Sequence, residues 1–265
     1  MAEIENSKDL LSVLWSGADI LRSKMDANEY KDYLLGIVFY KYLSDSFLIK
    51  VYDLLNDEKP SSLKAALEEY REALKDESAD ELMEEIKSTC HYVIEPELTY
   101  TCFADAARNN SFNREYLQKA FNNIEQSDPL FTDLFTDIDL YSNRLGTGDQ
   151  KQSDTISSLI KEIDKADLLN TDDDVLGNAY EYLIGQFASE TGKKAGEFYT
   201  PQAVSKILTK IAIAGQEDKK GLSVYDPCMG FRVIIVTEAN SLGNIRVFEL
   251  LPKLKTEKLS GWCTA

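Results

Sequence analysis

The sequence predicts a mainly α-helical protein, with a helical bundle over about residues 1–165 and the first elements of an α/β domain over residues 166–265. Two observations predict this division. In the first part, apolar residues recur at three- and four-residue spacing between short polar breaks, which is the pattern of packed amphipathic helices. In the second part, the short apolar run Leu222–Tyr225 leads directly into an acidic residue and a glycine turn. Such a turn is typical of the end of the first strand in a doubly wound sheet.

Composition limits the classes of function. The 265 residues carry a formal net charge of −17, so the chain as a whole repels a phosphate backbone. Any contact with DNA must then be local or supplied by a partner. The N-terminus lacks a basic segment followed by a long apolar run, and no window approaches the length of a membrane span. We therefore expect a cytoplasmic protein that does not cross a membrane.

The cysteines are poor material for a zinc site. They are widely spaced, without a CxxC pair, and the chain has one histidine, His91. We expect reduced thiols and no metal ligands at these positions, which are Cys90, Cys102, Cys228 and Cys263. With no second ligand near it, His91 is expected to be structural rather than a catalytic base.

The first two helices are predicted from their apolar spacing. Residues 7–24 carry a stripe formed by Leu10, Leu11, Leu14, Ala18 and Leu21. Asn28 is expected to cap a second helix that is apolar over most of its circumference and therefore lies at the centre of the bundle. The interleaved tyrosines and lysine at 40–42 are expected at the margin of the bundle, with their polar ends in water.

Serine caps and a proline divide the next part of the chain. Pro60 and the serine pair after it open an acidic helix, and Ser78 or Asp80 starts another. Residues 90–103 contain β-branched and aromatic residues and Pro96, so they predict an extended crossing segment.

Residues 111–125 predict a further helix. The fragment at 128–131, Asp-Pro-Leu-Phe, predicts a turn that starts the next helix, because its proline suits a first helical position and helical patterns surround it. Residues 142–155 have two glycines and no apolar periodicity, so they predict a surface loop.

The most informative stretch begins after a predicted flexible loop at 189–196. The three aspartates at 172–174 before it are expected to cap a helix rather than to bind a metal. After the loop, Thr200 is placed to cap a helix from Pro201 to about Ile213. Two aromatic rings, a hydroxyl and free backbone N–H groups would then meet at one helix N-terminus. This combination suits a flat heterocycle that bears a carboxylate, although plain capping with buried aromatics explains it equally well for this segment alone.

Together with the turn after Tyr225, these segments resemble the modification methylases of type I restriction-modification systems. The resemblance runs from about Leu14 to Gly230. The stretch LWSGADILRSKMDANEYKDYLLGIVFYKYLSD is similar to the N-terminal signature of the family, GEFYTP matches its first cofactor motif, and VYDPCMG begins its second.

The resemblance implies a helical N-terminal domain followed by a Rossmann-like domain that uses S-adenosyl-L-methionine to methylate the exocyclic amine of adenine. It also implies partners, namely the specificity subunit, which would grip the DNA, and the restriction subunit. Carried over to this chain, the cofactor pocket would be lined by Glu197, Phe198, Tyr199, Thr200, Pro201 and Gln202. The turn under the methionine moiety would be formed by Asp226, Pro227 and Gly230.

The sequence departs from the family pattern after Gly230. The family continues with a small residue and a glycine, whereas this chain has Phe231 and Arg232 where backbone must approach the ligand. The codons for FRVIIV also permit Ser-Gly-Ser-Leu-Leu in a second reading frame, so we hypothesise that one inserted base makes residues 231–265 an atypical tail. Glu249 has the position of an acid that binds the cofactor ribose, but the residues before it depart from the family, and we leave it unassigned.

Two functions remain in view. The chain has no Pro-Pro and thus no Asn-Pro-Pro-Phe-like segment to hold a flipped adenine, so we expect the methyltransferase subunit to be inactive in this form. The alternative is a non-catalytic helical module that docks the specificity subunit. A short sheet would also leave unpaired edges, which predicts self-association or a poorly ordered C-terminus.

Overall fold

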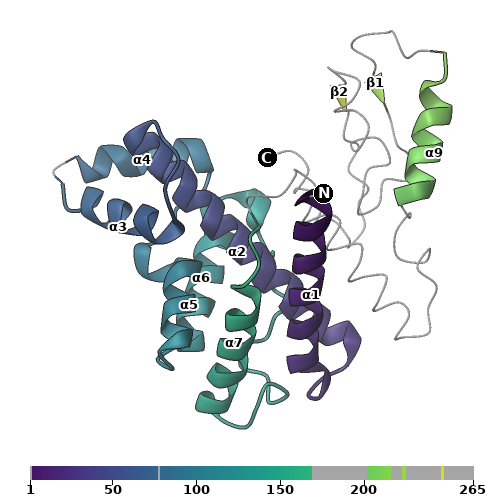
Figure 1. The fold of residues 1–265 in the computed structure, drawn as a ribbon. Coiled ribbons are helices and arrows are strands. Elements are labelled where there is room, and N and C mark those ends of the chain that lie inside the picture. Colours follow the sequence, from purple (N-terminus) through teal and green to yellow (C-terminus); the bar gives the residue numbers. More distant parts are fainter. Residues whose placement is uncertain (1, 77, 169–201, 216–222, 225–245, 248–265) are drawn as a thin grey trace. The chain divides into compact units, whose positions relative to one another are not determined.

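The computed structural model describes residues 2–76, 78–168, 202–215, 223–224 and 246–247 (Figure 1). The chain divides into two compact units, Met1–Leu183 and Ile184–Ala265, and each is described by itself. The predicted domain boundary after residue 165 stays a prediction. The elements are, in chain order, α1 Ala2–Arg22, α2 Ala27–Asn56, α3 Leu63–Ala73, α4 Ala79–Cys90, the 3-10 helix η1 Pro96–Leu98, α5 Tyr100–Arg108, α6 Arg114–Ser127, the 3-10 helix η2 Pro129–Phe131, α7 Asp149–Ile163, α9 Gln202–Ile213, β1 Ser223–Val224 and β2 Arg246–Val247.

These elements confirm the predicted fold class, a helical bundle followed by the start of an α/β domain. The predicted stripe of α1 is buried at Leu14, Ala18 and Leu21, which are 0% exposed. α1 also packs closely on two helices at Gly17, where a Cβ would lie 2.8 Å from Leu34 of α2 and 3.1 Å from Leu159 of α7. Such an approach leaves no room for a larger residue.

Helix α2 is the centre of the bundle, as predicted, and α1, α3, α4, α5 and α7 all contact it (Figure 1). Its predicted cap was wrong. The helix begins at Ala27 with Asp26 as the N-cap, so Asn28 lies within its first turn. Asp26 and Glu29 form a capping box, in which the Glu29 carboxylate accepts the Asp26 backbone N–H at 3.3 Å. The residue three positions after Asp26 is a glutamate, and this reciprocal pair favours the earlier start.

The expectation for residues 40–42 was also wrong at two positions. Tyr40 is 0% and Lys41 is 4% exposed, so both lie in the core rather than at its margin. The ammonium of Lys41 is paired with the carboxylate of Asp45 one turn later, at 2.5 Å. A buried lysine needs such a partner, because an isolated charge is strongly disfavoured away from water.

Four buried tyrosines connect separate segments of the bundle through their hydroxyl groups. Each O–H donates to a backbone carbonyl, at distances from 2.7 to 3.2 Å. The pairs are Tyr40 with Leu98, Tyr70 with Ile94, Tyr92 with Leu43, and Tyr100 with Ile160. These bonds give each buried hydroxyl group the hydrogen-bond partner that its burial requires.

The prediction of one extended segment over residues 90–103 was wrong. α4 ends at Cys90, η1 covers Pro96–Leu98, and α5 starts at Tyr100. Thr99 is the N-cap of α5, and its hydroxyl accepts the Cys102 backbone N–H at 3.4 Å. The β-branched and aromatic residues therefore serve as a cap and as the buried face of a short helix, because packing outweighs intrinsic strand preference. His91 is exposed and ends α4 with a φ of 65°, where its backbone N–H donates to the Lys87 carbonyl at 3.0 Å. Its role among the described contacts is structural.

The predicted loop at 142–155 was wrong in its second half, because α7 begins at Asp149. The buried face of this helix starts with polar residues, which hid its periodicity. Gln152 donates to the carbonyl of Tyr141 at 2.9 Å, and the Thr155 hydroxyl donates to that of Leu145 at 2.7 Å. These polar side chains are buried because they hold the preceding loop.

The starts of α3 and α4 confirm the prediction. Ser62 caps α3, with its side chain accepting the Ala65 N–H at 3.1 Å, and Ser78 is the N-cap of α4. The predicted helix at 111–125 is α6, and the predicted turn at 128–131 is the 3-10 helix η2.

The close approach of Gly36 in α2 to Ile138 permits a direct test of the packing around α2. A Cβ at Gly36 would overlap Ile138 Cδ1 and lie 3.3 Å from its Cγ1. We expect Gly36→Ala to lower the free energy of unfolding by about 1–3 kcal/mol through overpacking, although alanine gains about 0.5–1 kcal/mol of helix propensity. Ile138→Val removes the overlapping methyl group, so the double variant should be more stable than the sum of the two single changes predicts. Urea unfolding of the three variants measures this, and simple additivity would contradict the predicted contact.

Candidate cofactor site

In the second unit the structure describes α9, β1 and β2, which adjoin the predicted cofactor motifs in the sequence. The two strands are parallel, with Ser223 opposite Arg246 and Val224 opposite Val247. Parallel neighbours need a crossover connection, and their carboxyl ends meet at the same edge of the sheet. The short run predicted as the first strand therefore forms one, and a second strand follows beside it in the same direction.

Gln202 is the one predicted cofactor residue among those that the structure describes, and it is the first residue of α9. The predicted helix start at Pro201 is thus correct to within one residue. The other predicted residues lie outside the described ranges. They are Glu197, Phe198, Tyr199, Thr200 and Pro201, which precede α9, and Asp226, Pro227 and Gly230, which follow β1.

The sequence analysis considered a second strand only as the element before Glu249. The apolar residues Ile245, Val247 and Phe248 around Arg246 are a sequence signal that could have predicted this strand directly. Glu249 follows β2 by two positions in the sequence, just as Asp226 follows β1 by two. Both acids lie outside the described residues, together with the aspartates at 172–174, the loop at 189–196 and Cys228 and Cys263.

Helix α9 has an apolar face. Its members are spaced three and four apart and are between 43% and 69% exposed, namely Val204, Ile207, Leu208 and Ile211. Apolar side chains at this spacing are typical of a helix that covers another layer of structure. In an α/β unit that layer is the sheet.

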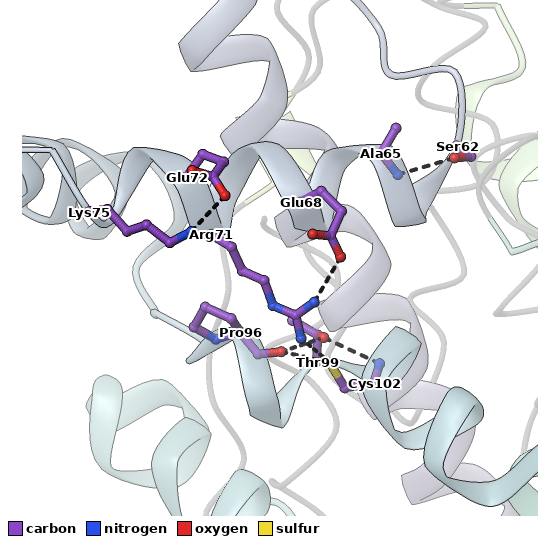
Figure 2. A network of polar contacts seen from close by, with 9 residues as sticks. All are labelled: Ser62, Ala65, Glu68, Arg71, Glu72, Lys75, Pro96, Thr99 and Cys102. Atoms are coloured by element: carbon purple, nitrogen blue, oxygen red, sulfur yellow. Dashed lines mark hydrogen bonds and ion pairs between the residues drawn. The ribbon is translucent and has the colours of Figure 1, made fainter. Parts of the chain in front are cut away.

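A polar network in the first unit is the second candidate for a functional site (Figure 2). Arg71 of α3 donates to the Glu68 carboxylate at 2.9 Å and to the Cys102 sulfur at 3.1 Å. The Cys102 thiol in turn donates to the Pro96 carbonyl at 3.0 Å. Because Pro96 and Cys102 belong to η1 and α5, the network ties α3 to that corner of the bundle. We interpret it as structural.

Metal ligands, free thiols and membrane-spanning helices are further features by which a site could be recognised. No group of three or more His, Cys, Asp or Glu side chains there is arranged to hold a metal ion. Cys90 is buried and Cys102 is partly exposed, and both are free thiols. No helix within the described ranges has the length and apolar character needed to cross a membrane.

Two family models match the chain. The HsdM N-terminal domain matches residues 10–163, and the N-6 DNA methylase matches residues 171–249. The second match contains all of the predicted cofactor residues. It also continues from Gly230 through residue 249, so this part of the predicted atypical tail falls within the matched region. The inserted-base hypothesis stays a prediction that the gene sequence would decide.

Individual methylase subunits are similar to the chain over most of its length. The chain is 28% identical, over 93% of its length, to the type I restriction enzyme MpnII methylase subunit of Mycoplasma pneumoniae. It is also 28% identical, over 90% of its length, to the MjaVIII methylase subunit of Methanocaldococcus jannaschii. It spans 45% and 36% of these relatives, so it corresponds to less than half of each.

A solved structure gives the same result. The crystal structure of the type I restriction-modification system methyltransferase subunit from Streptococcus thermophilus superposes with a TM-score of 0.82 and 43% sequence identity. The superposition covers 96% of this chain and 55% of that one. With more than half of its residues in the first family model, the chain belongs to the family of the HsdM N-terminal domain, that of the type I restriction-modification methylase subunits.

Proposed function

We propose that this chain is part of a DNA adenine N6-methyltransferase subunit of a type I restriction-modification system, and that it supplies the helical domain and the start of the cofactor site. The parallel pairing of β1 and β2 carries this proposal. It is the beginning of the sheet on which a Rossmann-like domain binds its ligand, and the predicted cofactor motifs adjoin α9 and β1 in the sequence.

The residues present suit S-adenosyl-L-methionine. Because β1 and β2 run parallel, the chain leaves both strands at one edge of the sheet, and an acid follows each strand by two positions. Carboxylates accept hydrogen bonds from an ammonium group or from ribose hydroxyls. We propose that Asp226 and its turn face the methionine moiety and that Glu249 serves the ribose. The cofactor, when bound, would supply the methyl group.

The aromatic residues before α9 have the second role in this proposal. Phe198 and Tyr199 would contact the flat adenine ring of the cofactor, and Thr200, Pro201 and Gln202 would present the start of the helix. Glu197 completes the segment. The 265 residues contain no Asn-Pro-Pro-Phe-like segment, so we propose that they do not themselves hold the target adenine.

The test is isothermal titration of S-adenosyl-L-methionine into the chain. We expect micromolar binding that Tyr199→Ala abolishes, because the variant removes the ring on which the adenine would stack. Tyr141→Ala is the matched control, since Tyr141 is 46% exposed and lies in the helical unit. Equal binding by all three proteins would contradict the role of Tyr199, and no heat from the unmodified chain would contradict its binding of cofactor on its own.

A second candidate is a non-catalytic module that docks the specificity subunit. It is favoured by the bundle itself, which has its own aromatic core and matches the HsdM N-terminal domain over residues 10–163. Co-purification with a specificity subunit by a chain that gives no titration heat would support this function over the first. Methyl transfer to DNA with the partner supplied would support the first.

The partners and the location follow from the same proposal. We propose that the specificity subunit grips the DNA, that the restriction subunit joins the complex, and that the assembly works in the cytoplasm. The net charge of −17 agrees with this division of work, because a chain so acidic has little general affinity for DNA. Self-association stays a prediction, and the apolar face of α9 is the surface on which a second copy would pack.

A further inference from the structure

Asp45 is a carboxyl group inside the bundle with one oxygen bonded and one not. Its side chain is 2% exposed, and its Oδ2 accepts the Lys41 ammonium at 2.5 Å. Its Oδ1 is buried and has no hydrogen-bond partner within the described part of the chain. A charged oxygen in that position is costly, since neither water nor a donor compensates for its lost hydration.

Nearby donors are already engaged. The backbone N–H of Tyr100 donates to the Ser44 hydroxyl at 2.7 Å, and the Tyr100 O–H donates to the Ile160 carbonyl at 2.9 Å. The Lys41 ammonium lies 5.1 Å from the centre of the Tyr100 ring as well as on Asp45. These contacts join α2, α5 and the last turn of α7, so Asp45 lies where the three helices meet.

The charged groups around Asp45 oppose one another. Lys41 on α2 favours the ionised carboxylate, whereas Asp164 and Asp167, which follow α7, disfavour it. Arg108 at the end of α5 pairs with Asp164 and offsets part of that acid's charge. Burial is the largest influence, and with the two acids it outweighs Lys41 and raises the pKa of Asp45 from 3.8 to about 6.

We propose that Asp45 is a proton switch at the junction of α2, α5 and α7, taking up a proton at its unpaired Oδ1 while Oδ2 keeps the Lys41 contact. Protonation relieves the cost of the unbonded, unhydrated Oδ1 and leaves the Lys41 ammonium on a neutral carboxyl group, whereas ionisation restores the ion pair together with that cost. The chain leaves α7 through this junction, where Ala166 and Leu168 are each 4% exposed.

The direction of the effect follows from linkage. The folded state holds the proton more tightly than the unfolded chain, so the stabilisation is fully present below the unfolded pKa of 3.8 and is lost as the pH rises through about 6. The difference corresponds to a rise of about a hundredfold in the unfolding equilibrium constant over that window.

The experiment is urea unfolding of the full chain from about pH 4.5 to about pH 7.5, compared between the unmodified protein and Asp45→Asn. Asp45→Asn should lose this part of the pH dependence. Asp164→Asn is the control, because it changes a nearby acid whose side chain is 22% exposed, leaves Asp45 in place and should keep most of the pH dependence. Identical pH dependence in the unmodified protein and Asp45→Asn would overturn the proposal.

A direct measurement covers the case in which Asp45→Asn does not fold. Carboxyl carbon NMR of the unmodified chain follows each aspartate as the pH changes. A midpoint for Asp45 near the expected value of about 6 supports the switch. A midpoint below about 4 means that Lys41 keeps the carboxylate ionised throughout, and the proposal fails.

Discussion

Replacing Lys41 by methionine is expected to lower the free energy of unfolding by about 3–5 kcal/mol at about pH 7.5. The side chains of Lys41 and Asp45 are 5% and 2% exposed and 2.5 Å apart, so the variant leaves a buried carboxylate without its partner. The loss should shrink at about pH 5, because Asp45 is then protonated in the folded state and carries less uncompensated charge. Chemical denaturation at the two pH values measures both effects.

A double variant separates the pair from its parts. Lys41→Met with Asp45→Leu removes both charges and keeps apolar volume, so it should recover most of the lost stability and can exceed the unmodified protein. The exposed pair Lys75 and Glu72, 68% and 67% exposed, provides the control. Lys75→Met should change stability by about 1 kcal/mol or less. A similar loss for Lys41→Met and Lys75→Met would show that the Lys41 pair is not buried in solution.

The second large effect is expected at Phe121 of α6, which is 1% exposed. Its ring is stacked on that of Phe135, with centroids 4.0 Å apart and planes 5° apart, and it forms a T-shaped pair with the Tyr40 ring at a centroid distance of 5.6 Å. Phe121→Ala should lower the free energy of unfolding by about 3–5 kcal/mol, from lost burial and the cavity left behind. The lost contacts of the Phe121 ring with Phe135 and Tyr40 are part of this destabilisation.

Tyr116 of the same helix is the matched control for Phe121, since it is 54% exposed. Tyr116→Ala should change stability by about 0.5 kcal/mol or less, because the substitution lies away from the core. Thermal unfolding followed by circular dichroism compares the two variants, which have the same change in helix propensity to within a few tenths of a kcal/mol. Equal losses of stability in Phe121→Ala and Tyr116→Ala would contradict the buried aromatic stack.

Local features were predictable from the sequence because their causes lie within a few residues. The α1 stripe and the serine cap of α3 depend on spacing or on one capping side chain, and α9 starts at Gln202, within one residue of the predicted start. The candidate site stays a prediction from the sequence, in which GEFYTP directly precedes α9 and Asp226 follows β1 by two positions. The family matches extend over the same motifs.

Only the tertiary structure decided which polar residues are buried and which strands pair. Lys41 was placed at the margin because a lysine normally keeps its charge in water, but Asp45 one turn away makes its burial acceptable. Gln152 and Thr155 were assigned to a loop because their partners are carbonyls of the preceding turn, not apolar neighbours. The parallel partner of β1 lies more than twenty residues further along, at β2, and no local pattern specifies that register. In each case the physical cause is a contact between residues that the fold brings together, and spacing along the chain cannot reveal it.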